Sequence, residues 1–231
     1  MLLCVLSLIL PEELNPDDSA PVRRQNHAEP EATRGVLCLA TSSDPTNSTG
    51  WIQRRVVFPG RSKSGALLLR ETGPHCLYWG AGKIHITSSS DPAKWTEGIE
   101  FIVSTAFEGW AQQNTGVESG PPPMQLSDGN YLFLHNSWSF NRTQYAVAGY
   151  QPAWVIIDGT DPTHIIARAP QPLWSPQRQP WMEGKAPFTC NVDNVAFLEA
   201  AHPTNNKDEF RVYFGGSDTV VGSAVIKISV P

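Results

Sequence analysis

The stretch Arg61–Trp95, RSKSGALLLRETGPHCLYWGAGKIHITSSSDPAKW, contains three short apolar runs. The runs Ala66–Leu69, Cys76–Trp79 and Ile84–Thr87 are each too short for a globular helix, and each is bounded by Gly, Pro or Ser. Glycine and proline in the two connections suit tight turns, some of which need residues with positive φ. The stretch therefore predicts three consecutive antiparallel strands.

The third run ends in an Asp-Pro turn, and the same ending occurs twice more. Asp44-Pro45, Asp91-Pro92 and Asp161-Pro162 each follow an apolar run, and they are 47 and then 70 residues apart. An aspartate carboxylate can accept backbone N–H bonds in such a turn, and proline prevents further ladder pairing. A repeat of this size indicates the four-stranded blades of a β-propeller. The alternative is an ordinary β-sandwich that uses Asp-Pro turns.

The composition predicts an all-β fold with one main domain. The chain has 231 residues, of which 40% are hydrophobic, together with 18 Gly and 20 Pro, and no window keeps a long apolar pattern of period 3.6. We expect the propeller domain to span residues 35–231. Residues 1–34 form an apolar start followed by a polar lead, which is a signal segment or disordered. The apolar start, Met1–Leu10, also fits a strand of a blade.

Charge and motif content exclude several function classes. The net charge of −5 provides no basic surface to gather phosphates, so no nucleic-acid partner is expected. Ten apolar residues are too few to cross a bilayer, and no membrane partner is predicted. Gly-rich phosphate loops and His-Glu-x-x-His are absent, so we expect no cofactor and no metal. The four cysteines are widely separated, which favours buried thiols over a disulfide.

Two short patterns bear on the compartment. Asn47-Ser48-Thr49 and Asn141-Arg142-Thr143 match the N-glycosylation acceptor pattern, and the chain starts with an apolar segment. Together they favour an extracellular protein, with a cytoplasmic one as the alternative.

The remaining segments continue the strand pattern. Ser127–Asn130 is a hairpin turn, and Glu100–Val103 is expected to begin a new sheet. The loop Pro170–Pro187 is rich in Pro and Trp, and a loop of this length is more often functional than idle. Further strands are expected at Tyr131–His135, Tyr145–Asp158, Ile165–Ala169, Val195–Leu198, Phe210–Gly215 and Val221–Val230.

Three segments together resemble one known family. They are GPPPMQLSDGNYLFLHN from Gly120, YAVAGYQPAWVIIDGTDPTHIIARAPQPLWSP from Tyr145 and VYFGGSDTVVGSAVI from Val212. They resemble the second half of glycoside hydrolase family 130, the β-mannoside phosphorylases and their hydrolase relatives. The resemblance runs from about Gly35 to the C-terminus. It implies a five-bladed β-propeller of the glycosidase type with a funnel-shaped central site, of which this chain can build about four blades.

The resemblance also implies substrate-binding residues. Asp218 matches an Asp that faces the sugar, and Lys63 matches a Lys of the phosphorylase anion pocket. His135 closes a strand in the matching place, and we expect it to approach Asp218 near the propeller axis. Trp79 stands where phosphorylases carry a His and offers a ring for sugar stacking, and Tyr145 completes the set. The alternatives are a turn-capping Asp, a surface Lys and a structural His.

One departure from the family pattern concerns catalysis. The family's proton-donor Asp lies in a Glu-Asp-Pro-Arg motif, and this chain has no such motif. Because glycoside cleavage needs a carboxylic acid to protonate the leaving oxygen, the chain is predicted to be a poor catalyst that does not use phosphate. The expected function is a glycoside hydrolase-like protein acting on or binding β-mannosides or related β-linked oligosaccharides. The alternative is a non-catalytic sugar- or protein-binding propeller. If hydrolysis occurs, Glu118 and Asp193 are the first acid candidates.

Overall fold

Almost all the regular structure of this chain is β-strand. The computed structural model describes residues 2–11, 33–58, 63–96, 100–103, 115–139, 149–176, 179–185 and 192–229. Within these residues there are sixteen strands and one short helix, α1 (Pro180–Glu183). The predicted all-β class is confirmed.

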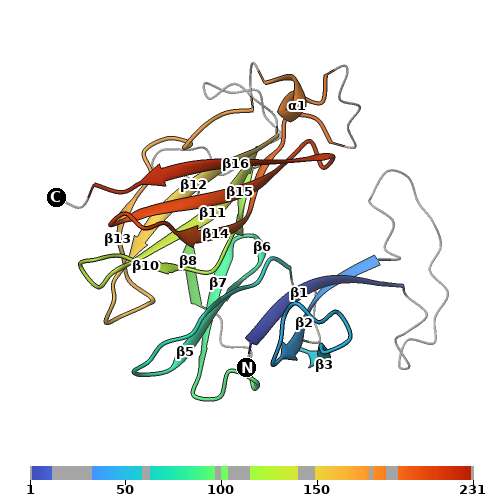
Figure 1. Ribbon diagram of the computed structural model, residues 1–231, viewed down its shortest axis with the longest axis vertical. Helices are drawn as coiled ribbons and strands as arrows, with labels where there is room; N and C mark the ends of the chain where they lie inside the picture. The colour runs from blue at the N-terminus through green and yellow to red at the C-terminus, as the bar shows by residue number, and fades with distance from the viewer. Residues whose placement is uncertain are drawn as a thin grey trace.

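The strands form four antiparallel sheets, shown in Figure 1. In the first sheet the order is β1 (Leu2–Pro11), β2 (Thr33–Ser42) and β3 (Ile52–Val56). In the second sheet it is β4 (Ala66–Leu68), β5 (His75–Trp79), β7 (Ile84–Ser89) and β8 (Glu100–Val103).

The third sheet has the order β13 (Ile165–Arg168), β12 (Gly149–Ile157), β11 (Tyr131–Ser139), β9 (Thr115–Ser119) and β6 (Ala81–Gly82), with β10 (Met124–Gln125) pairing on β11. The fourth sheet has the order β14 (Ala196–Pro203), β15 (Glu209–Gly216) and β16 (Val220–Lys227).

The stretch Arg61–Trp95 forms its three predicted strands as β4, β5 and β7. One neighbouring prediction was wrong, because β8 does not begin a new sheet. It pairs with β7 through Ile84↔Val103 and His85↔Phe101, and so forms the last strand of the second sheet. Side-chain pattern alone does not specify which neighbour a short strand pairs with.

The three Asp-Pro turns occupy equivalent places, as predicted. Asp44-Pro45, Asp91-Pro92 and Asp161-Pro162 lie between β2 and β3, β7 and β8, and β12 and β13, which are the last two strands of each sheet in chain order. In every turn the Asp Oδ1 accepts a bond from the N–H two residues later, at 2.9–3.0 Å. The indole N–H groups of Trp51 and Trp95 donate to the carbonyls of Pro45 and Pro92. The repeat is therefore structural.

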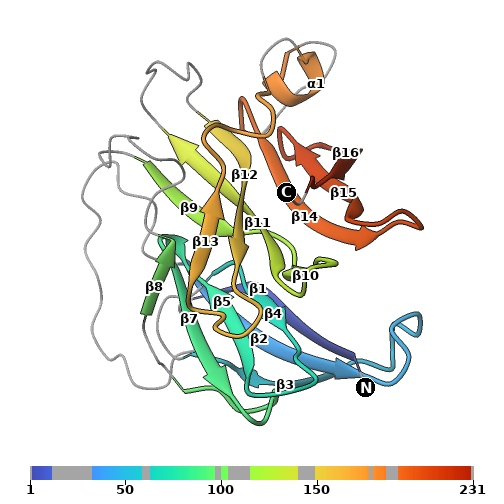
Figure 2. The ribbon, with the colours of Figure 1, turned by 90° about the vertical axis from the view of Figure 1, so that its left-hand side faces the viewer.

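Neighbouring sheets bury apolar side chains against each other in chain order. Because side chains alternate along a strand, β5 sends Leu77 toward the first sheet and Tyr78 toward the third, and β11 sends Phe133 toward the second and Leu134 toward the fourth. Figure 2 shows the four sheets following one another from the blue end of the chain to the red end. They are the blades of the predicted β-propeller, about four in this chain.

The first sheet extends N-terminal of the predicted domain boundary. β1 pairs with β2 along its whole length, from Leu2↔Ser42 to Pro11↔Thr33. The boundary at residue 35 falls inside β2. The interpretation of Met1–Leu10 as a signal segment stays a prediction, and residues 12–32 lie outside the described residues. Within the described ranges, no helix has the length and apolar character needed to span a membrane.

Two of the cysteines bear out the prediction of buried thiols. Cys38 on β2 and Cys76 on β5 are free and buried. Burial raises the pKa of both thiols. Because the thiolate is the reactive form, these side chains are inert packing groups at neutral pH.

We expect Asn136→Ala to destabilise the protein, because this buried side chain joins the third sheet to the fourth. Its amide donates to the Leu198 carbonyl at 3.1 Å, and its Oδ1 accepts from the Leu198 N–H at 2.6 Å. Without these two bonds, the N–H and the carbonyl of Leu198 lose their side-chain partner, which should lower the free energy of unfolding by about 2 kcal/mol. Urea unfolding would measure it, with exposed Asn206→Ala as the control. Equal stability of Asn136→Ala and wild type would contradict the cross-link.

Candidate functional site

Glu118 on β9 is the hub of a polar network between the second and third sheets. Its side chain is almost completely buried. One carboxylate oxygen accepts from the Ser64 hydroxyl at 2.7 Å and lies 3.6 Å from the Lys63 ammonium. The other accepts from the Tyr150 hydroxyl at 3.2 Å. A buried carboxylate with three such partners is held in one position, and it orients Lys63 and Tyr150 in turn.

A glycine holds the loop that carries Lys63 and Ser64 against β5. The backbone N–H of Gly80 donates to the Lys63 carbonyl at 2.8 Å. Gly80 has φ +130°, and a Cβ there would lie 2.2 Å from the carbonyl oxygen of Lys83, which precedes β7. Only glycine allows this close approach. The Gly80 N–H, directly after β5, thus anchors the Lys63 backbone.

Glu118 faces the fourth sheet, where two more carboxyl groups lie. Glu118 pairs with Asn136 across the β9–β11 ladder, so the two side chains share one face. Because Asn136 bonds to Leu198, that face meets β14 next to Glu199, at the point where the β14–β15 register shifts. Asp218 lies in the turn between β15 and β16.

The pKa of Glu199 responds to the charges of both other carboxyl groups. It is raised above its usual value, first by partial burial of the carboxyl group, then by the negative charge of Asp218, and then by that of Glu118. We call the group of Lys63, Glu118, Tyr150, Glu199 and Asp218 the acidic site.

The acidic site can accept many hydrogen bonds and donate a few. Each ionised carboxylate offers two acceptor oxygens, which suits a ligand rich in hydroxyl groups. The Tyr150 ring also packs against Phe197, with ring centroids 5.4 Å apart. In the part of the chain that the structure describes, no three His, Cys, Asp or Glu side chains cluster as metal ligands do.

Of the predicted site residues, Lys63 and Asp218 belong to the acidic site, but His135 does not. His135 is completely buried on the face of β11 that packs against the second sheet, opposite to the face of Asn136. Among the described residues, neither of its ring nitrogens has a hydrogen-bond partner, and burial lowers the pKa of the ring to about 3. The structure does not bring His135 to Asp218, and its contact with a sugar stays a prediction.

The other two predicted residues are not placed at the acidic site either. Trp79 is buried between the first two sheets, where its ring stacks on His85 at 4.6 Å and contacts Phe58 at 4.7 Å. Its ring faces are thus used by the protein core, and sugar stacking on Trp79 stays a prediction. Tyr145 lies outside the described residues.

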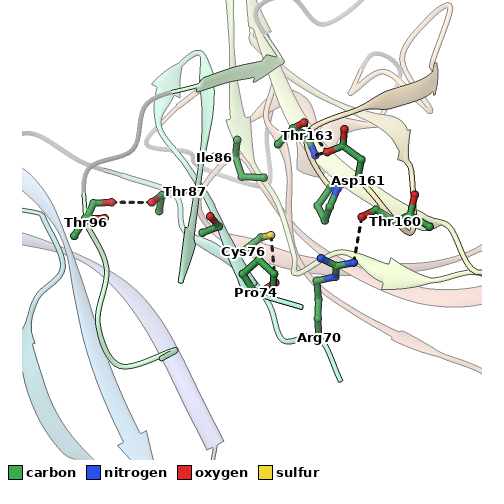
Figure 3. A pocket seen from close by; sticks show the side chains of 11 residues that line it. Arg70, Pro74, Cys76, Ile86, Thr87, Thr96, Thr160, Asp161 and Thr163 are labelled. Atoms are coloured by element: carbon green, nitrogen blue, oxygen red, sulfur yellow. Dashed lines mark hydrogen bonds between the residues drawn. The ribbon is translucent and has the colours of Figure 1, made fainter. Parts of the chain in front are cut away.

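A cavity of about 560 Å³ lies elsewhere, between the second sheet and the β12–β13 turn (Figure 3). Several polar side chains that line it already form hydrogen bonds with other groups of the protein. Arg70 donates to the Gly159 carbonyl, Thr87 to a backbone carbonyl, and Thr163 to Asp161. The cavity contains none of the predicted site residues, and we do not place the functional site there.

Sequence reasoning named Glu118 only as an acid candidate, and it missed Ser64, Tyr150 and Glu199. No pattern marks Glu199, because its position depends on the irregular β14–β15 register. Asp193, the second acid candidate, is exposed in a bend preceding β14. A search for carboxylates at strand ends would have found Glu118 but not its partners.

The structure is a β-propeller with a group of carboxylates, the acidic site, where consecutive sheets meet. The chain belongs to the Glyco_hydro_130 family, whose description is beta-1,4-mannooligosaccharide phosphorylase. The model of this family matches residues 37–230 of the chain. The resemblance seen in the sequence is confirmed.

Individual relatives agree with this family. The chain is 28% identical to a 1,2-beta-oligomannan phosphorylase of Thermoanaerobacter sp. (strain X514) over 194 residues, which cover 83% of this chain and 58% of that protein. A structure of a beta-1,2-mannobiose phosphorylase from Listeria innocua has a TM-score of 0.67 at 19% identity and covers 84% and 51%. A glycosyl hydrolase from Bacteroides ovatus has a TM-score of 0.66 at 20% identity and covers 87% and 59%. The chain thus spans little more than half the length of these proteins.

Proposed function

We propose that this chain binds β-linked mannosides at the acidic site and is a glycoside hydrolase-like protein. The convergence of Glu118, Glu199 and Asp218 from three separate elements carries the proposal, because carboxylates are the usual acceptors for sugar hydroxyl groups. Mannoside is the class of ligand named for the relatives in this family.

The charge balance of the acidic site disfavours phosphate as a second substrate. Among the described residues, Lys63 is the cation paired with Glu118, and its ammonium is already 3.6 Å from that carboxylate. Glu199 and Asp218 add negative charge nearby. A phosphate dianion would meet these carboxylates at short range, where like charges repel strongly.

Hydrolysis is a second candidate, favoured by the state of Glu199. A carboxyl group whose pKa is raised keeps its proton to higher pH and suits a general acid, while an ionised neighbour suits a base. Glycosidases use such a pair of carboxyl groups. Glu199 and Glu118 are then the groups to test, in place of the family motif that this chain lacks.

The test is to incubate the purified chain with β-1,2- and β-1,4-mannobiose, with and without phosphate. We expect calorimetry to detect binding that phosphate does not enhance, and no formation of mannose 1-phosphate. Asp218→Asn should weaken binding about tenfold, because one charge-assisted acceptor is lost. Exposed Asp128→Asn on the β10–β11 turn is the matched control.

Each outcome of this experiment decides something. Release of mannose 1-phosphate would overturn the exclusion of phosphate. Release of mannose without phosphate would establish the hydrolysis candidate, and loss of that activity in Glu199→Gln would identify the acid. Failure to bind either disaccharide would overturn the proposed function.

A further inference from the structure

Asp218 lies in a turn whose first central residue, Ser217, is not one that this turn favours. Ser217 and Asp218 have φ of 49° and 53°, and the Thr219 N–H donates to the Gly216 carbonyl at 3.0 Å. Two consecutive residues with positive φ are the mark of a type I′ hairpin turn, in which Gly, Asn and Asp are the usual residues and Ser is not. A non-glycine residue in this conformation costs free energy and persists only where its surroundings hold it.

The backbone of the short helix α1 stabilises this turn through a hydrogen bond. The Ser217 hydroxyl donates to the Met182 carbonyl at 2.6 Å, and Ser217 is completely buried. The same carbonyl accepts from the Val195 N–H at 3.0 Å, and the Val195 carbonyl accepts from the Ser217 N–H at 3.2 Å. These bonds form a closed set that joins α1, the start of the fourth sheet and the turn.

The Trp181 side chain presses on the same hairpin from α1. A Cβ on Gly216 or Gly222 would come within 2.6 Å of its indole ring, so the ring lies directly on the bare backbone of β15 and β16. It also contacts Phe214, with centroids 5.6 Å apart. α1 therefore contacts both strands of the hairpin beside the turn through Trp181.

We propose that α1 is a positioning element that holds the Asp218 carboxylate in the acidic site, with Ser217 as the positioning residue. The loop Pro170–Pro187, predicted from its length to be functional, acts in this way by carrying α1 rather than by touching the ligand. The inference deepens the proposed function and relies on it for the nature of the ligand.

The test compares two variants of the positioning residue. Ser217→Gly removes the hydroxyl, and glycine adopts positive φ without strain, so the turn can still form. Ser217→Ala removes the same hydroxyl but keeps the free-energy cost of a non-glycine residue at positive φ. We expect Ser217→Gly to weaken β-mannobiose binding about five- to tenfold. This factor corresponds to the free energy that one buried hydrogen bond contributes. Ser223→Gly, at an exposed position on β16, should bind like wild type.

A second measurement follows the geometry without any sugar. Because the Asp218 charge contributes to the raised pKa of Glu199, displacement of Asp218 should lower that pKa. NMR titration of the Glu199 carboxyl carbon should therefore show Ser217→Gly moving toward the value of Asp218→Asn, with Ser223→Gly unchanged. A general loss of stability alone would not shift this titration in the folded protein.

The two measurements separate the two claims. Wild-type affinity together with a wild-type Glu199 titration in Ser217→Gly would overturn the positioning role. If the wild-type chain does not bind mannobiose, the proposed function fails, but the titration still decides whether Ser217 positions Asp218.

Discussion

Glu118→Ala is expected to reduce β-mannoside binding about a hundredfold, because it removes a buried charged acceptor on which the site is assembled. The Ser64 and Tyr150 hydroxyls lose their acceptor, and Lys63 loses the carboxylate that orients its ammonium. The free energy of unfolding should fall by about 2 kcal/mol, mostly from the two hydroxyls. Lys63 adds little to that figure, because 53% of its side chain is exposed and can be hydrated.

Calorimetric titration with mannobiose and urea unfolding would measure the two effects. Glu118→Gln keeps the size and the acceptor oxygen but removes the charge, so its loss of affinity isolates the electrostatic part. Glu71→Gln, at an exposed turn position between β4 and β5, is the matched control. Unchanged affinity in Glu118→Ala would exclude the acidic site as the place where the sugar binds.

His135 is expected to make the fold sensitive to acid. Its pKa is lowered to about 3, first by complete burial and then by the positive charge of Arg168, whereas an unfolded histidine titrates near 6.5. Between these pH values the unfolded chain binds one more proton than the native protein, so stability falls as the pH falls. The stability that comes from the neutral His135 is fully present above about pH 6.5. The free energy of unfolding should fall by about 3 kcal/mol between that pH and pH 4.5.

Urea unfolding at pH 7 and at pH 4.5 would test this expectation. His135→Leu has no proton to bind at this position, so its stability should fall by about 3 kcal/mol less than that of wild type over the same interval. His202→Gln, at an exposed position on β14, should show the wild-type loss. An identical pH dependence in His135→Leu and wild type would contradict the lowered pKa. It would mean that the buried ring takes up its proton over the same pH range in the native and the unfolded state.

The sequence by itself determined the local structure and the family. The short runs in Arg61–Trp95 predicted strands, because each is shorter than an ordinary globular helix and is bounded by Gly, Pro or Ser. The Asp-Pro repeats marked equivalent turns because an Asp carboxylate and a proline ring act on residues within three positions. Those effects are short-range, and a single sequence contains all of the information they need. The motif segments likewise identified the family without a structure.

Only the tertiary structure decided which of the marked residues meet. His135 and Asn136 are adjacent in sequence, yet the strand sends one side chain toward the second sheet and the other toward the fourth. The charge of Glu118 acts on Glu199 because the β9–β11 register places Glu118 across from Asn136, and the register shift on β14 occurs at Glu199. A change of one residue in either register would turn these carboxyl groups away from each other. Register and the packing of sheet faces depend on residues far apart in the chain, and no local pattern encodes them.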